Sequence, residues 1–193
     1  MKRRIKRGSF CLSLIVFFTF LLGITALAAS QFPDVAADAE YAEAAAYLSE
    51  NGIMEGDTSG NFNPDKYVTR AQMAAIICRM LGEEETSKGS TGFSDVPASY
   101  WASGYIIKAT ELGAINGYQD GTFKPDNTVT YEQAIAMIVR AMNLEEHAVA
   151  MGGYPDGYVK VAIENGYTSR VSAQKGEQLN RGEIAILVKN AIG

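Results

Sequence analysis

Apolar residues recur every three or four positions along much of the chain, which is the spacing of one face of an α-helix. The pattern predicts a first kind of helix over residues 39–50 and 100–112, with Gly52 and Gly113 close behind, where a left-handed C-cap is favoured. A second kind of helix follows each glycine-rich segment. Its three apolar faces consist of Met73, Ile76, Ile77 and Met80, of Ile135, Ile138, Val139 and Met142, and of Ile184, Leu187, Val188 and Ile192. Such helices need one another, so a mainly α fold is expected.

A capping signal marks the starts of these second helices. Residues 69–72 read Thr-Arg-Ala-Gln and residues 130–133 read Thr-Tyr-Glu-Gln. In this form the threonine oxygen accepts from the third backbone amide and the glutamine side chain returns a hydrogen bond. Residues 180–183, Asn-Arg-Gly-Glu, can fill the same roles. The pattern therefore predicts three second helices that begin in the same way.

The chain also repeats itself at an offset of 61 residues. Ten residues between Phe32 and Thr69 recur between Phe93 and Thr130 without a gap. A third, shorter copy occupies the C-terminal end, where residues 154–166 resemble a first helix with its glycine turn. Repeats of this size usually stack to bury a shared core and present a surface. We expect repeats at 30–82, 93–143 and 153–193, the last one divergent, with connectors at 83–92 and 144–152.

Glycine, asparagine and proline are dense between the two helices of a copy, as over residues 53–68, which predicts a compact ordered loop. Phe62 and Phe123 are the expected apolar plugs that fix these loops to the helices. The acids and amides of the first loop suggest calcium. The glycine and terminal glutamate of a calcium-binding helix-loop-helix are not at the required offsets, however. No metal or other cofactor is expected.

The N-terminus has the features of a secretory leader. Five basic residues precede an apolar run from Phe10 to Ile24, and small residues follow it. This pattern is typical of a signal peptide, here over residues 1–29, with cleavage after Ala28 or Ala29. A membrane anchor is the alternative, but the run is shorter than the ~20 residues that a spanning helix needs. We expect a secreted chain that has no membrane attachment after cleavage.

Removal of this leader changes the charge balance. The whole chain has 17 basic and 22 acidic residues, and the five basic residues of the leader leave 12 against 22, a net charge of −10. A diffuse acidic surface argues against nucleic acid, whose backbone favours basic patches. It leaves room for an anionic ligand held by one or two arginines.

Residue types suited to catalysis are scarce. Cys78 is the only cysteine beyond the leader and lies among apolar neighbours, so a buried small hydrophobe is expected rather than a nucleophile. His147, the single histidine, lies in a connector, where a solvated side chain is more common than a base or a ligand. No metal-ligand cluster is recognisable, and no enzyme activity is expected.

The order of these motifs resembles the S-layer homology domain. In the second copy the resemblance rests on Phe-Ser-Asp-Val at 93–96, Gly-Ala-Ile-Asn-Gly-Tyr at 113–118 and Asp-Gly-Thr-Phe at 120–123. In the first copy it rests on Phe-Pro-Asp-Val at 32–35 and Thr-Arg-Ala-Gln at 69–72. The third copy is similar to a divergent last member of such a triplet. The resemblance implies a pseudo-threefold, three-pronged spindle, with one helix per repeat in a central bundle and grooves between the prongs.

The same resemblance implies a noncatalytic anchor for exported proteins at the cell wall or surface layer. Its ligand would be secondary cell-wall polysaccharide attached to peptidoglycan, often with an anionic, pyruvylated N-acetylmannosamine. The arginine of the family's Thr-Arg-Ala-Glu motif contacts the ligand. By position this role falls on Arg70 and Arg181, with Gln72 in the same motif as Arg70. The second copy has Tyr131 at that place, which makes its groove doubtful.

The chemistry of the candidate residues leaves alternatives open. An arginine at the first helical position lies beside the positive end of the helix, where free backbone donors also favour a carboxylate, and its planar fork suits the carboxylate of a pyruvate ketal. Alternatively, it is solvated or paired with an acid such as Glu132. Trp101 either stacks on a sugar or wedges into the repeat interface. Asp34 and Asp95 either cap the first helices, which is favoured, or accept from sugar hydroxyl groups. Tyr118 is a further groove candidate.

Two functions from different classes remain open at this point. The leading hypothesis is the carbohydrate-binding anchor, with a cargo domain or surface-layer proteins as possible partners. The second is a secreted protein-interaction or self-assembly module that keeps the fold without binding sugar. The degenerate second motif and the shortened third copy favour this second hypothesis. An enzyme is the weakest interpretation.

Overall fold

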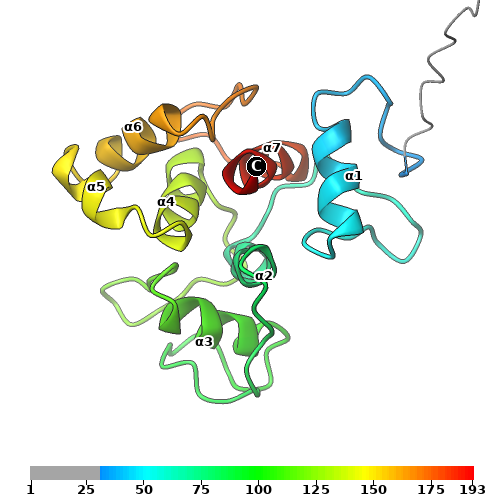
Figure 1. Ribbon diagram of the computed structural model, residues 1–193. Helices are drawn as coiled ribbons and strands as arrows, with labels where there is room; N and C mark the ends of the chain where they lie inside the picture. Colours follow the sequence, from blue (N-terminus) through cyan, green and yellow to red (C-terminus); the bar gives the residue numbers. More distant parts are fainter. Residues whose placement is uncertain (1–30) are drawn as a thin grey trace, which may run out of the picture.

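The computed structural model describes residues 31–193, so the predicted leader and its cleavage point lie outside the described residues. Within that range the chain forms seven α-helices joined by loops, and the only β-structure there consists of isolated β-bridges (Figure 1). None of these helices is long and apolar enough to cross a membrane. The fold is mainly α, as the sequence predicts.

Each copy contributes a first and a second helix. The first helices are α1 (Ala42–Glu50), α3 (Ser103–Glu111) and α6 (Asp156–Glu164), and the second helices are α2 (Arg70–Met80), α4 (Tyr131–Ala141) and α7 (Arg181–Ile192). In Figure 1 the second helices lie toward the middle of the molecule and the first helices lie outside them. This order agrees with the predicted alternation of two kinds of helix.

One hydrophobic core joins the three copies. Ile77, Ile138 and Leu187, one from each second helix, are at most 1% exposed. Phe62 and Phe123 are fully buried, which confirms that they plug the loops. Burial of each such side chain contributes about 1.5–3 kcal/mol, so the second helices are held by packing far more than by helix propensity.

The second helices begin with the predicted capping interactions. At α2, Thr69 Oγ1 accepts from Gln72 N at 3.2 Å, and Gln72 Oε1 accepts from Thr69 N at 3.0 Å. Residues 180–183 form the same reciprocal pair at α7. At α4 only half of the pair is within hydrogen-bonding distance: Gln133 Oε1 accepts from Thr130 N at 3.3 Å, whereas the buried Thr130 Oγ1 has no hydrogen-bond partner among residues 31–193. These bonds satisfy backbone amides that have no partner within the helix.

The first helices begin differently from the prediction. α1 and α3 start three residues after positions 39 and 100, because the preceding residues form turns. Their N-cap residues are Tyr41 and Ala102, and neither makes a side-chain capping bond. The prediction that Asp34 and Asp95 cap these helices is therefore wrong.

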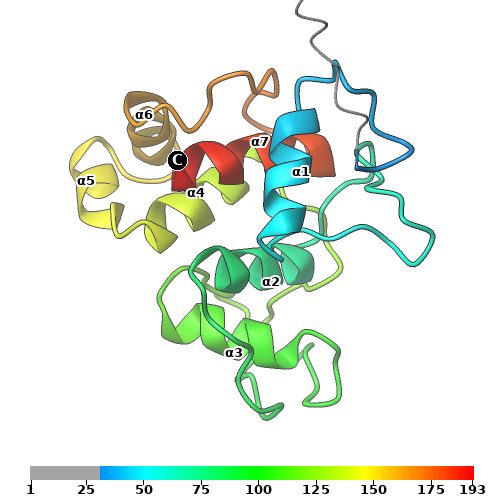
Figure 2. The same ribbon diagram turned by 45° about the vertical axis from the view of Figure 1, so that its right-hand side comes forward.

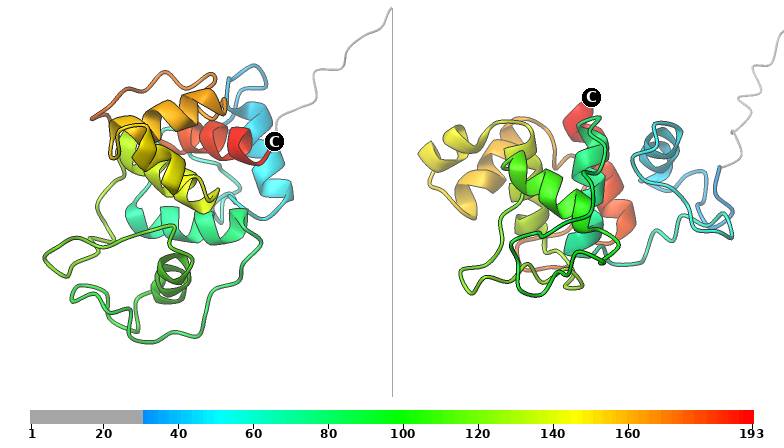
Figure 3. Two further views of the ribbon diagram at one scale, coloured as in Figure 1. Left: turned by 60° about the vertical axis from the view of Figure 1, so that its left-hand side comes forward. Right: turned by 90° about the horizontal axis from the view of Figure 1, so that it is seen from below.

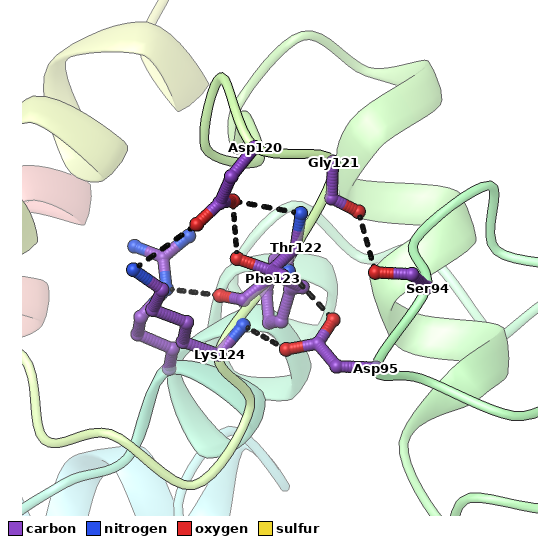
Figure 4. Close-up of polar contacts among 8 residues, drawn as sticks. Ser94, Asp95, Asp120, Gly121, Thr122, Phe123 and Lys124 are labelled. Atoms are coloured by element: carbon purple, nitrogen blue, oxygen red, sulfur yellow. Dashed lines mark hydrogen bonds and ion pairs between the residues drawn. The ribbon is translucent and has the colours of Figure 1, made fainter.

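The two aspartates instead anchor the loops. Asp95 Oδ1 accepts from Phe123 N at 2.8 Å and its Oδ2 accepts from Lys124 N at 2.7 Å (Figure 4). Asp34 holds the amides of residues 62–63 in the same way, at 2.8 and 2.7 Å. Lys124 has a φ of 57°, a left-handed turn that lets two successive amides converge on one carboxylate. Each loop is thus fixed by a residue almost thirty positions earlier.

Each first helix packs on the second helix of another copy. α3 contacts α2, α6 contacts α4, and α1 contacts α7 (Figures 2 and 3). The last of these pairs joins the first helix of the described chain to its final helix. The three copies are therefore interlocked, and the pairing closes on itself.

Three backbone hydrogen bonds join the copies in a ring just before the second helices. Val68 N donates to Leu179 O at 3.1 Å, Leu179 N donates to Val129 O at 3.1 Å, and Val129 N donates to Val68 O at 2.9 Å. All three residues are fully buried. The ring and the three helix pairs support the predicted pseudo-threefold spindle, which itself stays a prediction.

The second connector contains a helix that the sequence pattern did not predict. α5 (Glu145–Ala150) lies within residues 144–152 and packs against α6 (Figure 1). His147 lies on it, half exposed, with Nε2 3.7 Å from Glu164 Oε2. Six residues give too little periodicity for a prediction, and contacts with α6 stabilise the helix instead.

The cysteine is unsuited to chemistry. Cys78 is fully buried, which confirms the prediction, and burial raises the pKa of its thiol to about 11. The thiol is therefore protonated at neutral pH. Across residues 31–193, no group of three or more His, Cys, Asp or Glu side chains is placed to hold a metal ion.

Candidate ligand-binding grooves

Two grooves occupy equivalent places between copies, each with a cavity volume of about 220 Å³. The Arg70 groove is lined by residues that include Arg70, Asn116, Tyr118, Gln133, Arg140 and Tyr154. The Arg181 groove is lined by residues that include Glu55, Gln72, Arg79, Trp101 and Arg181. In both, all three copies contribute to the lining.

The two linings correspond at the same 61-residue offset as the sequence. The corresponding pairs are Glu55 with Asn116, Gly56 with Gly117, Gln72 with Gln133, and Arg79 with Arg140. The wall of the Arg181 groove is therefore formed by α2, and that of the Arg70 groove by α4. The two grooves therefore share the same arrangement of lining residues.

The guanidinium of Arg70 is held by the loop of the second copy. Its Nε donates to Phe123 O at 2.7 Å and its Nη2 donates to Asn116 O at 3.0 Å. The guanidinium carbon lies 4.8 Å from the ring centre of Tyr118 and 4.7 Å from that of Phe123. The residue is only 4% exposed. The alternative of a solvated arginine is therefore wrong, and so is a pairing with Glu132, which accepts from Gly176 N instead.

Arg181 makes the equivalent contacts with the loop of the first copy. Its Nε donates to Phe62 O at 2.7 Å and its Nη2 donates to Glu55 O at 2.8 Å. The guanidinium carbon is 4.8 Å from the Phe62 ring centre. Burial lowers the pKa of both motif arginines, but an arginine starts so far above neutrality that both stay charged.

The backbone donors at the starts of these helices are occupied. Arg70 N donates to Asn127 O at 2.8 Å, and Ala71 N donates to Pro125 O at 3.0 Å. At α7, Arg181 N likewise donates to Lys66 O at 2.9 Å. The expectation that free amides there assist a carboxylate is therefore wrong. Each motif guanidinium has five N–H donors and uses two of its nitrogens for carbonyls, so an anion in the groove would meet only the donors that remain.

A second arginine lines each groove. On α2, Arg79 Nη2 donates to Tyr105 OH at 3.2 Å. On α4, Arg140 Nη2 donates to Tyr158 OH, also at 3.2 Å. Arg140 in addition pairs with Glu145, its Nε lying 2.8 Å from Glu145 Oε1. Each groove thus combines two cations within a chain that is acidic as a whole.

An exposed aromatic side chain lies beside the cations in each groove. Trp101 is 47% exposed in the Arg181 groove, and the residue is the second before α3. Tyr154 is the second residue before α6 and shows the equivalent arrangement in the Arg70 groove, where 53% of its surface is exposed. The exposure of Trp101 favours the stacking interpretation over a wedge in the repeat interface.

The third equivalent position has other residues, which make other contacts. Tyr131 stands where the other copies have arginine, is 8% exposed and is hydrogen-bonded to Thr168. Asn190 stands where α2 and α4 have arginine. Its Nδ2 donates to the carbonyls of residues 167 and 169 at 3.0 and 2.8 Å. The third position therefore lacks both the motif arginine and the arginine near the end of the helix.

The structure distributes the predicted site residues between the two grooves. Tyr118 joins Arg70, whereas Gln72 and Trp101 join Arg181. Arg70 and Gln72 belong to one four-residue motif but serve different grooves, because two residues along a helix are separated by about 200°. Gln72 belongs with the arginine of another copy.

Asp34 and Asp95 lie behind the grooves. Their carboxylates hold the amides next to the carbonyls that accept from the motif arginines. They thus position the loops of both grooves. A direct contact of either aspartate, or of any other predicted site residue, with a ligand stays a prediction.

Sequence reasoning missed Arg79, Arg140, Gln133 and Tyr154. Arg79 and Arg140 lie in the last turns of their helices, where a cation is favourable for the helix dipole, so neither attracts attention as a site residue. The 61-residue offset could have revealed these two arginines, because it places an arginine at both positions. Only the three-dimensional arrangement shows that each faces the motif arginine of another copy.

Comparison with known proteins identifies the repeated unit. Residues 31–74 and 92–135 each match the S-layer homology domain. Both matched segments contain an aspartate anchor and its loop, and both run into a second helix. The third copy lies outside these two segments, and its assignment as an S-layer homology repeat stays a prediction.

The chain is similar to parts of larger proteins. It is 32% identical over 182 residues to a cell surface protein of Thermoanaerobacter kivui, a match that covers 92% of this chain and 23% of the relative. It is 40% identical over 81 residues to a cellulosome-anchoring protein of Acetivibrio thermocellus, covering 40% and 18%. It is 36% identical over 160 residues to an amylopullulanase of Thermoanaerobacterium thermosulfurigenes, covering 73% and 8%. The chain thus spans less than a quarter of the length of these relatives.

Proposed function

We propose that this chain is a noncatalytic cell-surface anchor whose two grooves bind an anionic, pyruvylated sugar of secondary cell-wall polysaccharide. The observation that carries the proposal is the convergence of two arginines and one exposed aromatic side chain in each groove. The fork of a guanidinium matches a carboxylate in two parallel hydrogen bonds, and an aromatic face matches the apolar face of a sugar ring. An acidic sugar presents both features.

Each part of a groove has a role in this proposal. The Arg181 guanidinium, fixed by two carbonyls, presents its remaining donors to the carboxylate. Arg79 adds a second cation from α2, and Trp101 supports the sugar ring. Arg70, Arg140 and Tyr154 act in the same way in the other groove. Because the motif arginines are held before the ligand arrives, little side-chain entropy is lost on binding.

The relatives support a role at the cell surface. One is named a cell surface protein and another a cellulosome-anchoring protein. A third is an amylopullulanase, but only 8% of its length is matched. We infer that the matched part is an attachment module and that such an enzyme's activity belongs to the remainder. The protonated, buried Cys78 is consistent with a module that lacks catalysis.

Co-sedimentation with purified cell walls tests the proposal. The mature chain is incubated with walls before and after chemical removal of secondary polysaccharide. Arg70→Ala and Arg181→Ala are compared with Tyr131→Phe, a matched control at the position that lacks arginine. We expect binding to need the polysaccharide and each arginine variant to weaken it about tenfold or more, since a charge-assisted contact contributes about 1.5–3 kcal/mol.

Other outcomes have distinct meanings. Binding that survives extraction would point to peptidoglycan itself and would contradict the proposed ligand. No binding to either kind of wall would favour the protein-interaction module. Because Arg70 is buried, thermal unfolding of each variant must show that weaker binding is not a loss of fold. Arg70→Lys and Arg181→Lys keep the charge but lose the fork, and we expect most of the affinity to be lost with them.

A further inference from the structure

The two grooves are equivalent in shape but not in charge. In the Arg70 groove, Glu145 Oε1 accepts from Arg140 Nε at 2.8 Å and from Tyr158 OH at 2.6 Å. Tyr158 OH is also the acceptor for Arg140 Nη2 at 3.2 Å. The three side chains form a closed network, and it commits two of the three guanidinium nitrogens of Arg140.

The corresponding arginine of the other groove has no such partner. Arg79 donates to Tyr105 OH, the counterpart of Tyr158, but no ion pair joins it to a carboxylate among residues 31–193. Glu84 follows Arg79 by five residues, as Glu145 follows Arg140, yet it lies exposed in the non-helical 83–92 connector. The difference arises because α5 begins at Glu145 and holds that carboxylate against α4 and α6.

Other acids near the grooves leave this contrast in place. Asp57 is close enough to favour the charged form of Arg181, but its carboxylate already accepts from Ser59 N, Asn61 N and Asn63 Nδ2. Glu132 lies near Tyr154 of the Arg70 groove and adds negative charge there. Glu132 thus makes the Arg70 groove less cationic. Asp57 acts in the opposite direction, but its hydrogen bonds turn its carboxylate toward its own loop, and it forms no ion pair with Arg181 or Arg79 among residues 31–193.

Access to the motif arginines differs in the same direction. Arg70 is 4% exposed and has Tyr118 against its guanidinium. Arg181 is only partly buried, and position 57, which corresponds to Tyr118, has an aspartate that points into its own loop. The Arg181 groove thus offers two guanidinium groups without a carboxylate partner, and the Arg70 groove offers one.

We infer that Glu145 sets unequal affinities in the two grooves: by neutralising Arg140 it makes the Arg70 groove the weaker site for an anionic sugar, and the Arg181 groove is the stronger one. This inference rests on the proposed function. Loss of the carboxylate releases Arg140 for the ligand, and the affinity of the Arg70 groove then approaches that of the Arg181 groove.

The chain provides its own reporter for the test. Trp101 is the only tryptophan and lines the Arg181 groove alone. Its fluorescence, or the ¹⁹F signal of 5-fluorotryptophan at that position, follows one groove, whereas calorimetry follows both. The probe is the methyl glycoside of pyruvylated N-acetylmannosamine, and the unpyruvylated glycoside is its neutral control. The variants are Glu145→Gln and, as the matched control, Glu84→Gln, which stands 61 residues earlier in the repeat.

We expect two dissociation constants for the unaltered protein, the tighter one equal to the value from Trp101. Glu145→Gln should tighten the weaker site about threefold, in line with the strength of a partly exposed ion pair, and leave the Trp101 value unchanged. Glu84→Gln should change neither. Equal affinities in the unaltered protein, or a Glu145→Gln variant whose weaker site is unchanged or weaker still, would overturn the inference while leaving the anchor intact. No binding of the pyruvylated probe to any variant, together with no sedimentation with walls, would overturn the proposed function itself.

Discussion

The starts of α2 and α7 have arginine, and the equivalent start of α4 has Tyr131, yet all three begin in the same ring of backbone hydrogen bonds. A second helix can therefore begin in this ring with or without an arginine. Arg70 and Arg181 each donate to loop carbonyls. At the equivalent place Tyr131 is buried and is hydrogen-bonded to Thr168 instead. Burying a charge has an energetic cost that a tyrosine avoids, so the two arginines are consistent with the proposed ligand role.

The same contrast extends to the neighbouring residues. Where α2 and α4 place Arg79 and Arg140, α7 has Asn190, which holds the loop carbonyls itself. Two positions before the first helix, Trp101 and Tyr154 have Glu40 as their counterpart. The third position thus lacks both arginines and the exposed aromatic side chain of the two grooves, and its residues make contacts within the fold instead.

Truncation of Tyr131 should produce the largest effect on stability. Tyr131→Ala removes a buried aromatic side chain and should lower the free energy of unfolding by about 3 kcal/mol, yet leave both grooves able to bind. Urea unfolding and wall co-sedimentation measure the two quantities on one sample. Lost binding at a urea concentration where the variant is still folded would show that the third position takes part in recognition.

Loss of a loop anchor should affect stability and one groove together. Asp95→Ala leaves the amides of residues 123–124 without their acceptor, and we expect a loss of about 2 kcal/mol. The loop carbonyl that positions Arg70 then moves, so binding in the Arg70 groove should weaken while the Trp101 signal stays unchanged. Ser94→Ala, at the neighbouring residue in Figure 4, is the control, because its hydroxyl makes one exposed contact at 3.3 Å. Equal losses in both grooves would contradict the separate anchoring of the loops.

Removal of the exposed aromatic side chain should affect binding without affecting the fold. Trp101→Ala should weaken the Arg181 groove by about 1 kcal/mol and leave the melting temperature nearly unchanged, since almost half of the side chain is in water. Calorimetry with the pyruvylated glycoside provides the measurement. Leu112→Ala, another partly exposed apolar residue, serves as control. A large fall in melting temperature would instead support the wedge interpretation of Trp101.

The smallest expected effect is the pH-dependent stability that Glu145 contributes by pairing with Arg140, an ion pair that Arg79 lacks. Hydrogen bonds from Arg140 and Tyr158 lower the pKa of Glu145, so its ionised form stabilises the fold. That contribution is complete above the ordinary pKa of a glutamate and is lost as pH falls through the lowered value. The stability difference between the unaltered protein and Glu145→Gln should therefore shrink to nothing in acid. Urea midpoints across this pH range measure it. A difference that persists below the lowered pKa would show that Glu145 acts through packing.

Much of the fold followed from local patterns. The second helices were predictable because their apolar faces span three turns and their capping pairs satisfy the backbone in a way that the sequence displays. The roles of Asp34 and Asp95 could not be predicted, because their hydrogen-bond partners lie 28 and 29 residues away. A carboxylate shortly before a helix is also typical of an N-cap.

The grooves were predictable only in part. The motif arginines could be identified by position, but Gln72 serves a different groove from Arg70 because the pairing of helices between copies is a long-range property. Arg79 and Arg140 resemble ordinary helix-ending cations until α3 and α6 are placed against them. The network of Glu145 depends on a six-residue helix, which is too short to give a pattern.

The closed ring also has a consequence for synthesis and export. Arg181 reaches the carbonyl of Glu55, 126 residues earlier, so the Arg181 groove cannot assemble until the last helix has emerged. The Arg70 groove needs nothing later than Tyr154 for its lining. A chain that stops before α7 would therefore lack the stronger of the two proposed sites.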